Sequence, residues 1–289
     1  MHRHSATVVG VLTVVGLLTG CAAAGPSARD VPTVATGSRS DAVSGSPAPW
    51  LVQTGDLHGW DSVRSDLDGN GLVVAFLGGA CDLPARATAG DAAAGAAEVH
   101  VSLHVSQSPG PPGGGCPSIG ISRDAHITLS EPLGHRPVVD DASGKTHLPF
   151  DGRLLRMPTR LPPGLELRFE SGVSSDGTQS DQQWSRLWVA PEHPGPKAMH
   201  CDATAPVGIR IVQASDATLP MTPDDVTGDG TTPVGSGTAT VRRQPQTGNL
   251  FLTWHDLSGR GVLVSSLVDC EGQTPYSVQQ MTDIADSLR

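Results

Sequence analysis

The chain has 289 residues, of which 37% are hydrophobic and 17% are charged, with 35 glycines and 24 prolines. This composition excludes a coiled coil, a collagen and a polytopic membrane protein, and the length allows one large domain or two small ones. The formal net charge of −10 argues against nucleic acid as a partner, because an acidic surface repels phosphate groups.

The first 20 residues have the pattern of a bacterial lipoprotein signal peptide. Arg3 precedes an apolar run, Ala6–Leu18, that is shorter than the about 20 residues a membrane-spanning helix needs. Leu18-Thr19-Gly20-Cys21 places an aliphatic and two small residues before a cysteine, and so resembles a lipobox. We therefore predict cleavage before Cys21, acylation of that cysteine and attachment to the membrane. An ordinary secretory signal with a chance cysteine is the alternative.

Residues 21–49 are predicted to form the lipid anchor and a flexible tether. From Ala22 to Pro49 the chain consists mainly of Ser, Gly, Ala, Thr and Pro, with few large apolar side chains. Such a segment cannot bury enough surface to offset the entropy of ordering it. We expect the tether to separate the folded part of the protein from the membrane.

Residues 50–150 are predicted to form a first β-rich domain. Gly71–Leu77 is a continuous apolar run, Val99–Val105 alternates apolar and polar residues, and Ile127 and Leu129 mark a further strand. Turn-forming clusters of Gly, Pro, Asp and Ser lie between these segments. A helical pattern is not evident here.

Asp66-Leu67-Asp68-Gly69-Asn70-Gly71 is the sharpest motif in this domain. It matches the opening of a calcium loop, in which Asp66, Asp68 and Asn70 would supply oxygen ligands. The twelfth position, which should carry a bidentate carboxylate, is Leu77. A hairpin turn, in which Asp-Gly and Asn-Gly supply positive φ angles, is the interpretation we favour, with calcium as the alternative.

The histidines His100 and His104 and the tryptophan Trp60 are weak candidates for functional sites in this domain. His100 and His104 share one strand face, but four residues of strand separate them by about 13 Å, too far to bind one metal directly. We therefore expect both to be solvated. Trp60, in His58-Gly59-Trp60, is a candidate for an exposed contact, although a place in the core is the safer expectation.

Residues 151–289 are predicted to form a second β-rich domain. Its strand patterns occur at Leu165–Phe169, Leu187–Val189, Val207–Val212, Thr238–Arg242, Leu250–Trp254 and Val262–Leu267. Ser174–Gln183 and Asp224–Gly237 are rich in polar residues and glycine, so we expect long loops there.

A helix is predicted to close this domain after Pro275. Ser277 and Gln280 have the spacing of a capping box, in which each residue bonds the backbone of the other. The apolar residues that follow recur on one helical face, which we expect to pack on the preceding strands. They are Val278, Met281, Ile284, Ala285 and Leu288.

Cysteine usage predicts two disulfide bonds. With Cys21 used by the lipid, four cysteines remain in an oxidising compartment. Three pairings are possible. We expect Cys81–Cys116 and Cys201–Cys270, because each bond then lies within one domain. A zinc site is the weaker alternative, because C-x-x-C spacing does not occur in the sequence.

Two stretches resemble actinobacterial envelope lipoproteins. Leu133–Asp140 leads into a turn ending Ser143-Gly144-Lys145, which in similar proteins is a strand, a turn and a strand. Thr238–Arg289, with Leu252-Thr253-Trp254 in a strand, is similar to the closing unit of extracytoplasmic sensor-like domains. The chain departs from that pattern at Cys270 and in a longer loop before the helix. The resemblance implies no catalytic residues.

These features together predict a mainly β (α+β) protein of two small disulfide-stapled domains on the extracytoplasmic face of the cell membrane. We expect a non-enzymatic interaction or sensor module with an envelope protein partner and no cofactor. One alternative is an envelope hydrolase, although G-x-S-x-G, S-x-x-K and H-E-x-x-H do not occur in the sequence. A Ser, His and Asp set in one pocket would favour it. The other alternative is a calcium-binding module.

Overall fold

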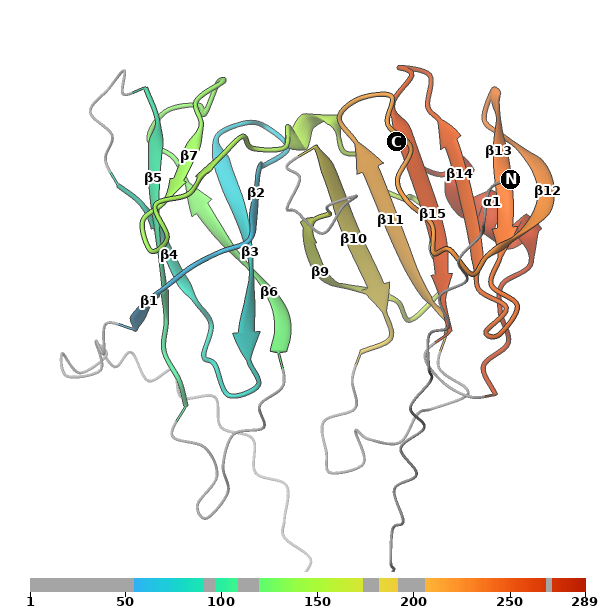
Figure 1. Ribbon diagram of the computed structural model, residues 1–289, viewed down its shortest axis with the longest axis horizontal. Helices are drawn as coiled ribbons and strands as arrows, with labels where there is room; N and C mark the ends of the chain where they lie inside the picture. Colours follow the sequence, from blue (N-terminus) through green and yellow to red (C-terminus); the bar gives the residue numbers. More distant parts are fainter. Residues whose placement is uncertain (1–54, 91–96, 109–119, 174–181, 192–205, 269–271) are drawn as a thin grey trace, which may run out of the picture. The chain divides into compact units, whose positions relative to one another are not determined.

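The structure describes most of the chain after residue 54. The computed structural model describes residues 55–90, 97–108, 120–173, 182–191, 206–268 and 272–289 (Figure 1). All of these belong to one compact unit, Pro49–Arg289. Within them, strands predominate and a single α-helix is formed, which confirms the prediction of a mainly β fold.

The first half of this unit contains two small sheets. Its strands are β1 (Asp56–His58), β2 (Ser62–Ser65), β3 (Gly71–Gly79), β4 (Arg86–Ala89), β5 (Val99–Val105), β6 (Gly120–Thr128), β7 (Val138–Asp140) and β8 (Thr146–His147). The first sheet is antiparallel in the order β2-β3-β6. In the second, β5 pairs with β1, β4 and β7, and β7 pairs with β8; the β5–β7 pair is parallel.

The second half is built on one seven-stranded antiparallel sheet. After the short helix η2 (Gly152–Leu154) come β9 (Glu166–Gly172), β10 (Gln183–Val189), β11 (Gly208–Ala214), β12 (Thr227–Val234), β13 (Gly237–Arg243), β14 (Leu250–His255), β15 (Gly261–Leu267) and α1 (Val278–Asp286). The strand order is β12-β13-β14-β15-β11-β10-β9. Consecutive strands are therefore mostly neighbours.

The strand predictions were accurate where apolar residues alternate or form a continuous run, and wrong where neither pattern is present. The loop predicted over Asp224–Gly237 is wrong, because most of it forms β12. All but the last residue of β12 are exposed or half-buried, and a bulge, Gly230 and Pro233 interrupt it. These features protect a sheet edge against pairing with other chains, but they also remove the apolar pattern of a strand. β10 likewise begins at Gln183, inside the other predicted loop.

The two small sheets enclose the first hydrophobic core. Val63, Leu72 and Phe76 from β2 and β3 pack in one cluster with Val101 and Leu103 from β5. The alternation predicted in Val99–Val105 is confirmed, since its valines and leucine are buried while its polar residues are not. Trp60 is 3% exposed in this core, so it is a core residue rather than an exposed contact.

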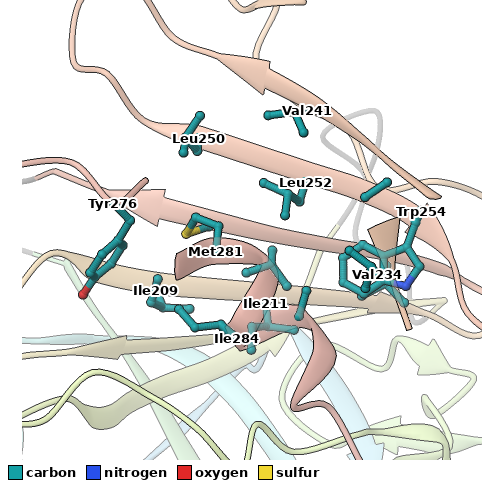
Figure 2. Close-up of a cluster of buried hydrophobic side chains, with 14 of the residues drawn as sticks. Ile209, Ile211, Val234, Val241, Leu250, Leu252, Trp254, Tyr276, Met281 and Ile284 are labelled. Atoms are coloured by element: carbon teal, nitrogen blue, oxygen red, sulfur yellow. The ribbon is translucent and has the colours of Figure 1, made fainter. Parts of the chain in front are cut away.

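The second core lies between the large sheet and α1. Met281 and Ile284 of the helix pack against Ile209, Leu250 and Leu252 of the sheet (Figure 2). The helix begins at the predicted capping box, in which Ser277 Oγ accepts a bond from the backbone of Gln280 at 3.2 Å. The predicted helix and its packing on the preceding strands are therefore confirmed.

A buried charge cluster joins the two halves. Arg64 of β2 donates to Glu170 of β9, with Nε 3.0 Å from Oε2. Arg186 and Trp184 of β10 donate to the same oxygen, each at 2.9 Å. The Arg64 guanidinium also lies 5.6 Å from the centre of the Trp184 ring. Side chains of Arg64 and Glu170 are only 5% exposed, so this cluster is a core feature of the fold.

Burial and pairing act in opposite directions on Glu170. Burial raises the pKa of its carboxyl, because the charged form loses its hydration. The hydrogen bonds and charge of Arg64, followed by the charge of Arg186, outweigh that effect and lower the pKa to about 2. Glu170 is therefore ionised at neutral pH between two guanidinium groups.

The predicted domain boundary near Phe150 and the two disulfide pairings stay predictions. Each side of Phe150 has its own hydrophobic core, while the charge cluster connects the two sides. Cys81 lies in the turn after β3 and is disulfide-bonded. Cys116, Cys201 and Cys270 lie outside the described residues, as does the lipidation site Cys21.

Candidate functional site

The Asp66–Gly71 motif forms the turn that connects β2 to β3. The Asp66 amide donates to Gly71 O at 2.9 Å, and the Asn70 amide donates to Asp68 Oδ1 at 2.8 Å. Gly69 has φ +79°, a left-handed conformation that favours glycine. This geometry is that of the hairpin turn predicted from the sequence.

Two carboxylates lie close together in this turn. Asp66 reaches back over Gly71, where a Cβ would lie 2.5 Å from Asp66 Oδ2, so only glycine fits. Asp66 Oδ1 is buried and has no hydrogen-bond partner among the described residues. Asp68 is exposed, and the hydrogen bond from the Asn70 backbone amide is the main cause that lowers its pKa. Among the described residues, no basic side chain pairs with Asp66 or Asp68.

The residues that would complete a calcium loop are not assembled here. Leu77, at the twelfth position, lies in β3 and is 57% exposed. Within the described ranges, no three His, Cys, Asp or Glu side chains are grouped so that they could hold a metal ion. The motif therefore supplies the oxygen ligands of Asp66, Asp68 and Asn70 but not the bidentate carboxylate of a calcium loop.

A pocket of about 440 Å³ opens beside the turn, and we call it the turn pocket. Three segments line it: residues 65–69, Pro132–Arg136 and Leu148–Arg153. Backbone hydrogen bonds hold them together, from Leu133 N to Gly69 O at 3.1 Å and from Ser65 N to Phe150 O at 2.9 Å. The volume is within the range of small-ligand sites, about 300–1,000 Å³.

Glycine at position 152 allows the third segment to approach β2. A Cβ at this position would lie 2.0 Å from the carbonyl oxygen of Ser65, which no side chain can tolerate. The Gly152 amide instead donates to Ser65 Oγ at 2.9 Å. This contact fixes Asp151 and Arg153 at the wall of the turn pocket.

The basic side chains of the turn pocket are already paired within the protein. Arg136 donates to the carbonyl oxygens of Leu133 and Pro132 at 3.0 and 2.9 Å. Arg153 forms a two-bond fork with Asp151, at 2.9 and 2.8 Å. The lining thus carries two carboxylates, Asp68 and Asp151, and two guanidinium groups, and Asp68 is the carboxylate without a basic partner among the described residues.

Hydrogen bonding by Arg153 keeps Asp151 ionised. It is the main cause that lowers the Asp151 pKa, and the charge of His135 acts in the same direction. His135 is itself exposed on the wall of the turn pocket. Beside these polar groups, Leu148 is 70% exposed, so the turn pocket offers both an apolar and an acidic surface.

A second polar cluster lies on the outward face of β5. Asp141, just after β7, contacts His100 Nδ1 at 2.9 Å and accepts a hydrogen bond from Ser102 Oγ. His100 Nε2 lies 3.2 Å from Glu98. Hydrogen bonds to Asp141 and then Glu98 raise the pKa of His100. His100 is therefore a partly solvated residue that is also paired, which the sequence did not indicate.

The order of contacts in this cluster differs from that of a hydrolase triad. In a triad, the histidine contacts the serine and the acid orients the histidine. Here Asp141 contacts both Ser102 and His100, and both imidazole nitrogens face carboxylates. His104, on the same face, has its Nδ1 2.9 Å from Gly55 O. The contacts of Ser102, His100 and Asp141 therefore do not match those of a catalytic triad.

Sequence analysis located only part of the turn pocket. Of the predicted set, Asp68 lines the turn pocket while Asp66 and Asn70 lie in the adjoining turn, and Leu133–Arg136 lay in a stretch noted for its resemblance. Leu148, Asp151 and Arg153 were missed. Their sequence has no motif, because they reach the pocket only through the backbone bonds between β2 and Phe150.

Comparisons of the chain with protein-family models, curated proteins and solved structures gave no match. Over the part of the chain that the structure describes, no helix is long and apolar enough to cross a membrane.

Proposed function

We propose that this protein is a lipid-anchored, extracytoplasmic interaction module that binds a basic, partly apolar segment of an envelope protein in the turn pocket. One observation carries the proposal. Asp68 lies on the wall of a pocket of about 440 Å³ without a basic partner among the described residues, next to the exposed side chain of Leu148.

The charge distribution supports a basic ligand. Arg153 is paired with Asp151 and Arg136 is held by two backbone carbonyls, so an incoming ammonium or guanidinium group would find Asp68 without a basic partner among the described residues. Leu148 would cover the apolar part of the same ligand and exclude water from it. The net charge of −10 would attract basic partners over longer distances.

Membrane attachment is the first testable part of the proposal. The Leu18–Cys21 lipobox supports acylation of Cys21 and placement on the extracytoplasmic face. Cys21→Ser removes the acylated thiol, so most of the protein should leave the membrane fraction. We would measure this by fractionating cells that express either form. Equal membrane retention of both forms would contradict the anchor.

Ligand preference in the turn pocket is tested with two short synthetic peptides. We expect a blocked peptide of alternating leucine and lysine to bind, and one of alternating leucine and glutamate not to bind. Asp68→Asn should weaken the first interaction about fivefold, because an ion pair at an exposed carboxylate contributes little affinity. Isothermal titration calorimetry at low and high salt would measure both effects.

Asp224→Asn is the matched control, because Asp224 is also exposed and lies outside the turn pocket. It should leave binding unchanged. Equal binding of the two peptides, or no effect of Asp68→Asn, would contradict a basic ligand in the turn pocket.

Calcium binding is the second candidate, and one observation favours it. Asp66 Oδ1 is buried without a hydrogen-bond partner beside Asp68, a position in which a cation would satisfy both carboxylates. A separate thermal unfolding experiment on the protein, in millimolar calcium and in chelator, tests this candidate. A calcium-dependent rise in Tm that Asp68→Asn abolishes would favour calcium, and no shift would remove it.

A further inference from the structure

A second pocket lies at one end of the seven-stranded sheet, apart from the turn pocket. It has a volume of about 380 Å³ and we call it the sheet-end pocket. The β12–β13 turn, the β14–β15 turn and the C-terminal end of α1 surround it. None of its lining residues belongs to the turn pocket, so the two can be tested separately.

The floor of the sheet-end pocket is apolar. Val234, Trp254 and Val262 are 5%, 7% and 3% exposed, and they belong to the second hydrophobic core. Figure 2 shows Trp254 and Val234 together at one end of that core. Leu257, at the opening, is 83% exposed, the largest value among the exposed large apolar side chains. An apolar ligand would cover Leu257 while it contacts this floor.

Two arginines contact Asp256, which lies at one wall of the pocket. Asp256 Oδ2 accepts a hydrogen bond from Arg260 at 2.8 Å, and Arg156 Nε approaches the same oxygen at 3.5 Å. Asp256 Oδ1 already accepts the Ser258 amide at 2.8 Å. The carboxylate is therefore satisfied without Arg156. Arg260 lies outside the lining of the pocket and Arg156 lies within it, so Arg156 is the guanidinium group that a ligand in the pocket would meet.

Arg156 is the group that remains available to a ligand. Its backbone is held on both sides by Gln213, which accepts the Arg156 amide at 2.9 Å and donates to its carbonyl at 3.0 Å. Among the described residues, neither Nη atom of Arg156 has a hydrogen-bond partner. A guanidinium group with two free N–H donors in one plane matches the geometry of a carboxylate.

The opposite wall limits the charge of the ligand. Asp286, near the end of α1, is exposed and accepts a hydrogen bond from the Gly235 amide. Its negative charge would repel a second anionic group on the same ligand. The pocket therefore suits one negative charge, placed at the Arg156 side.

We propose that the sheet-end pocket binds a small monocarboxylate with an apolar body. Arg156 donates two N–H groups to the carboxylate, while Trp254 and Leu257 contact the apolar body. Both ends of the ligand are required, because the carboxylate alone would gain little from an exposed arginine and the apolar body alone would leave that arginine unpaired.

The test uses full-length protein in lipid nanodiscs and hexanoate as the probe, with empty nanodiscs as the blank. Calorimetric titration should show saturable binding of hexanoate, with weaker binding of acetate, which lacks the apolar body, and of hexanol, which lacks the charge. Trp254 fluorescence should change over the same concentration range, since its ring lines the pocket.

Single substitutions test whether Arg156 binds the carboxylate of hexanoate. Arg156→Gln should weaken hexanoate binding about tenfold, as expected for loss of a charged hydrogen-bond pair. Leu257→Ser should weaken it severalfold without affecting folding, because Leu257 is 83% exposed. Arg86→Gln is the matched control, because Arg86 is exposed and lines neither pocket, and it should leave hexanoate binding unchanged. Unchanged binding in Arg156→Gln, or no binding in the millimolar range, would overturn the proposal.

Discussion

Glu170→Gln should destabilise the folded protein by about 3 kcal/mol or more, the typical cost of removing one partner from a buried ion pair. The glutamine would leave Arg64 and Arg186 facing each other without the negative charge between them. Glu170 is 5% exposed and Arg186 is 4% exposed, so water cannot replace the lost charge. Trp184 would keep a hydrogen-bond acceptor, although a neutral one.

Urea unfolding followed by circular dichroism at neutral pH measures this effect. Glu166→Gln is the matched control, because Glu166 lies on the same strand, is exposed and has no ion-pair partner among the described residues. It should change the free energy of unfolding by less than about 0.5 kcal/mol. Equal unfolding free energies for the two variants would show that the charge cluster does not stabilise the fold.

The number of urea unfolding transitions tests whether the protein has two separate domains. The charge cluster is a contact between the two hydrophobic cores, so weakening it lowers their coupling. If residues 50–150 and 151–289 are separate domains, Glu170→Gln should split one unfolding transition into two. A single transition in the variant would argue against the boundary near Phe150.

Loss of stability in acid is the second large effect. The carboxyl of Glu170 has a pKa of about 2 in the folded protein, whereas its ordinary pKa, taken for the unfolded chain, is 4.5. A carboxyl with a lowered pKa stabilises the folded state above its unfolded pKa, and this contribution disappears as the pH falls. We expect Glu170 to contribute about 3 kcal/mol at neutral pH and to lose most of it between pH 4.5 and pH 2.

The measurement compares the wild type with Glu170→Gln across this pH range. Several other carboxyls with lowered pKa values, among them Asp151 and Asp256, weaken both proteins in acid. The difference between the two proteins isolates Glu170. It should be constant above about pH 5 and shrink toward zero at pH 2. A difference that stays constant down to pH 2 would contradict an ionised Glu170.

The charge cluster and the turn pocket are connected through β2. Side chains alternate along a strand, so Arg64 points to Glu170 while Ser65 lines the turn pocket. Ser65 also accepts the Gly152 amide, which holds the third segment of the pocket. A variant that displaces β2 would therefore change ligand binding as well as stability, and Glu170→Gln should be examined for both.

Local sequence patterns were sufficient to predict a secondary-structure element where its defining residues are close together in the chain. The strict alternation in Val99–Val105 and the apolar run Gly71–Leu77 predicted β5 and most of β3. Ser277 and Gln280 predicted the start of α1. In each case the residues that decide the structure are near neighbours in the chain, so the sequence alone determines the element.

Only the tertiary structure decided which distant residues meet. Arg64 and Glu170 are 106 positions apart, and neither residue carries a sequence signal for the other. β12 was missed because its residues are exposed and are paired only by β13. In the turn pocket, the sequence singled out Asp68, since a turn is local, while Asp66 and Asn70 of the same motif do not line the pocket.

The remaining walls of both pockets come from segments brought together by backbone bonds and side-chain packing. Leu148 reaches the turn pocket through the contact of Phe150 with β2, and Arg156 reaches the sheet-end pocket through Gln213. The sequence by itself therefore determined a mainly β fold, a closing helix and an acidic turn, and it predicts a lipobox. The tertiary structure decided which charges are buried, paired or left available, because burial and pairing depend on neighbours that are distant in the chain.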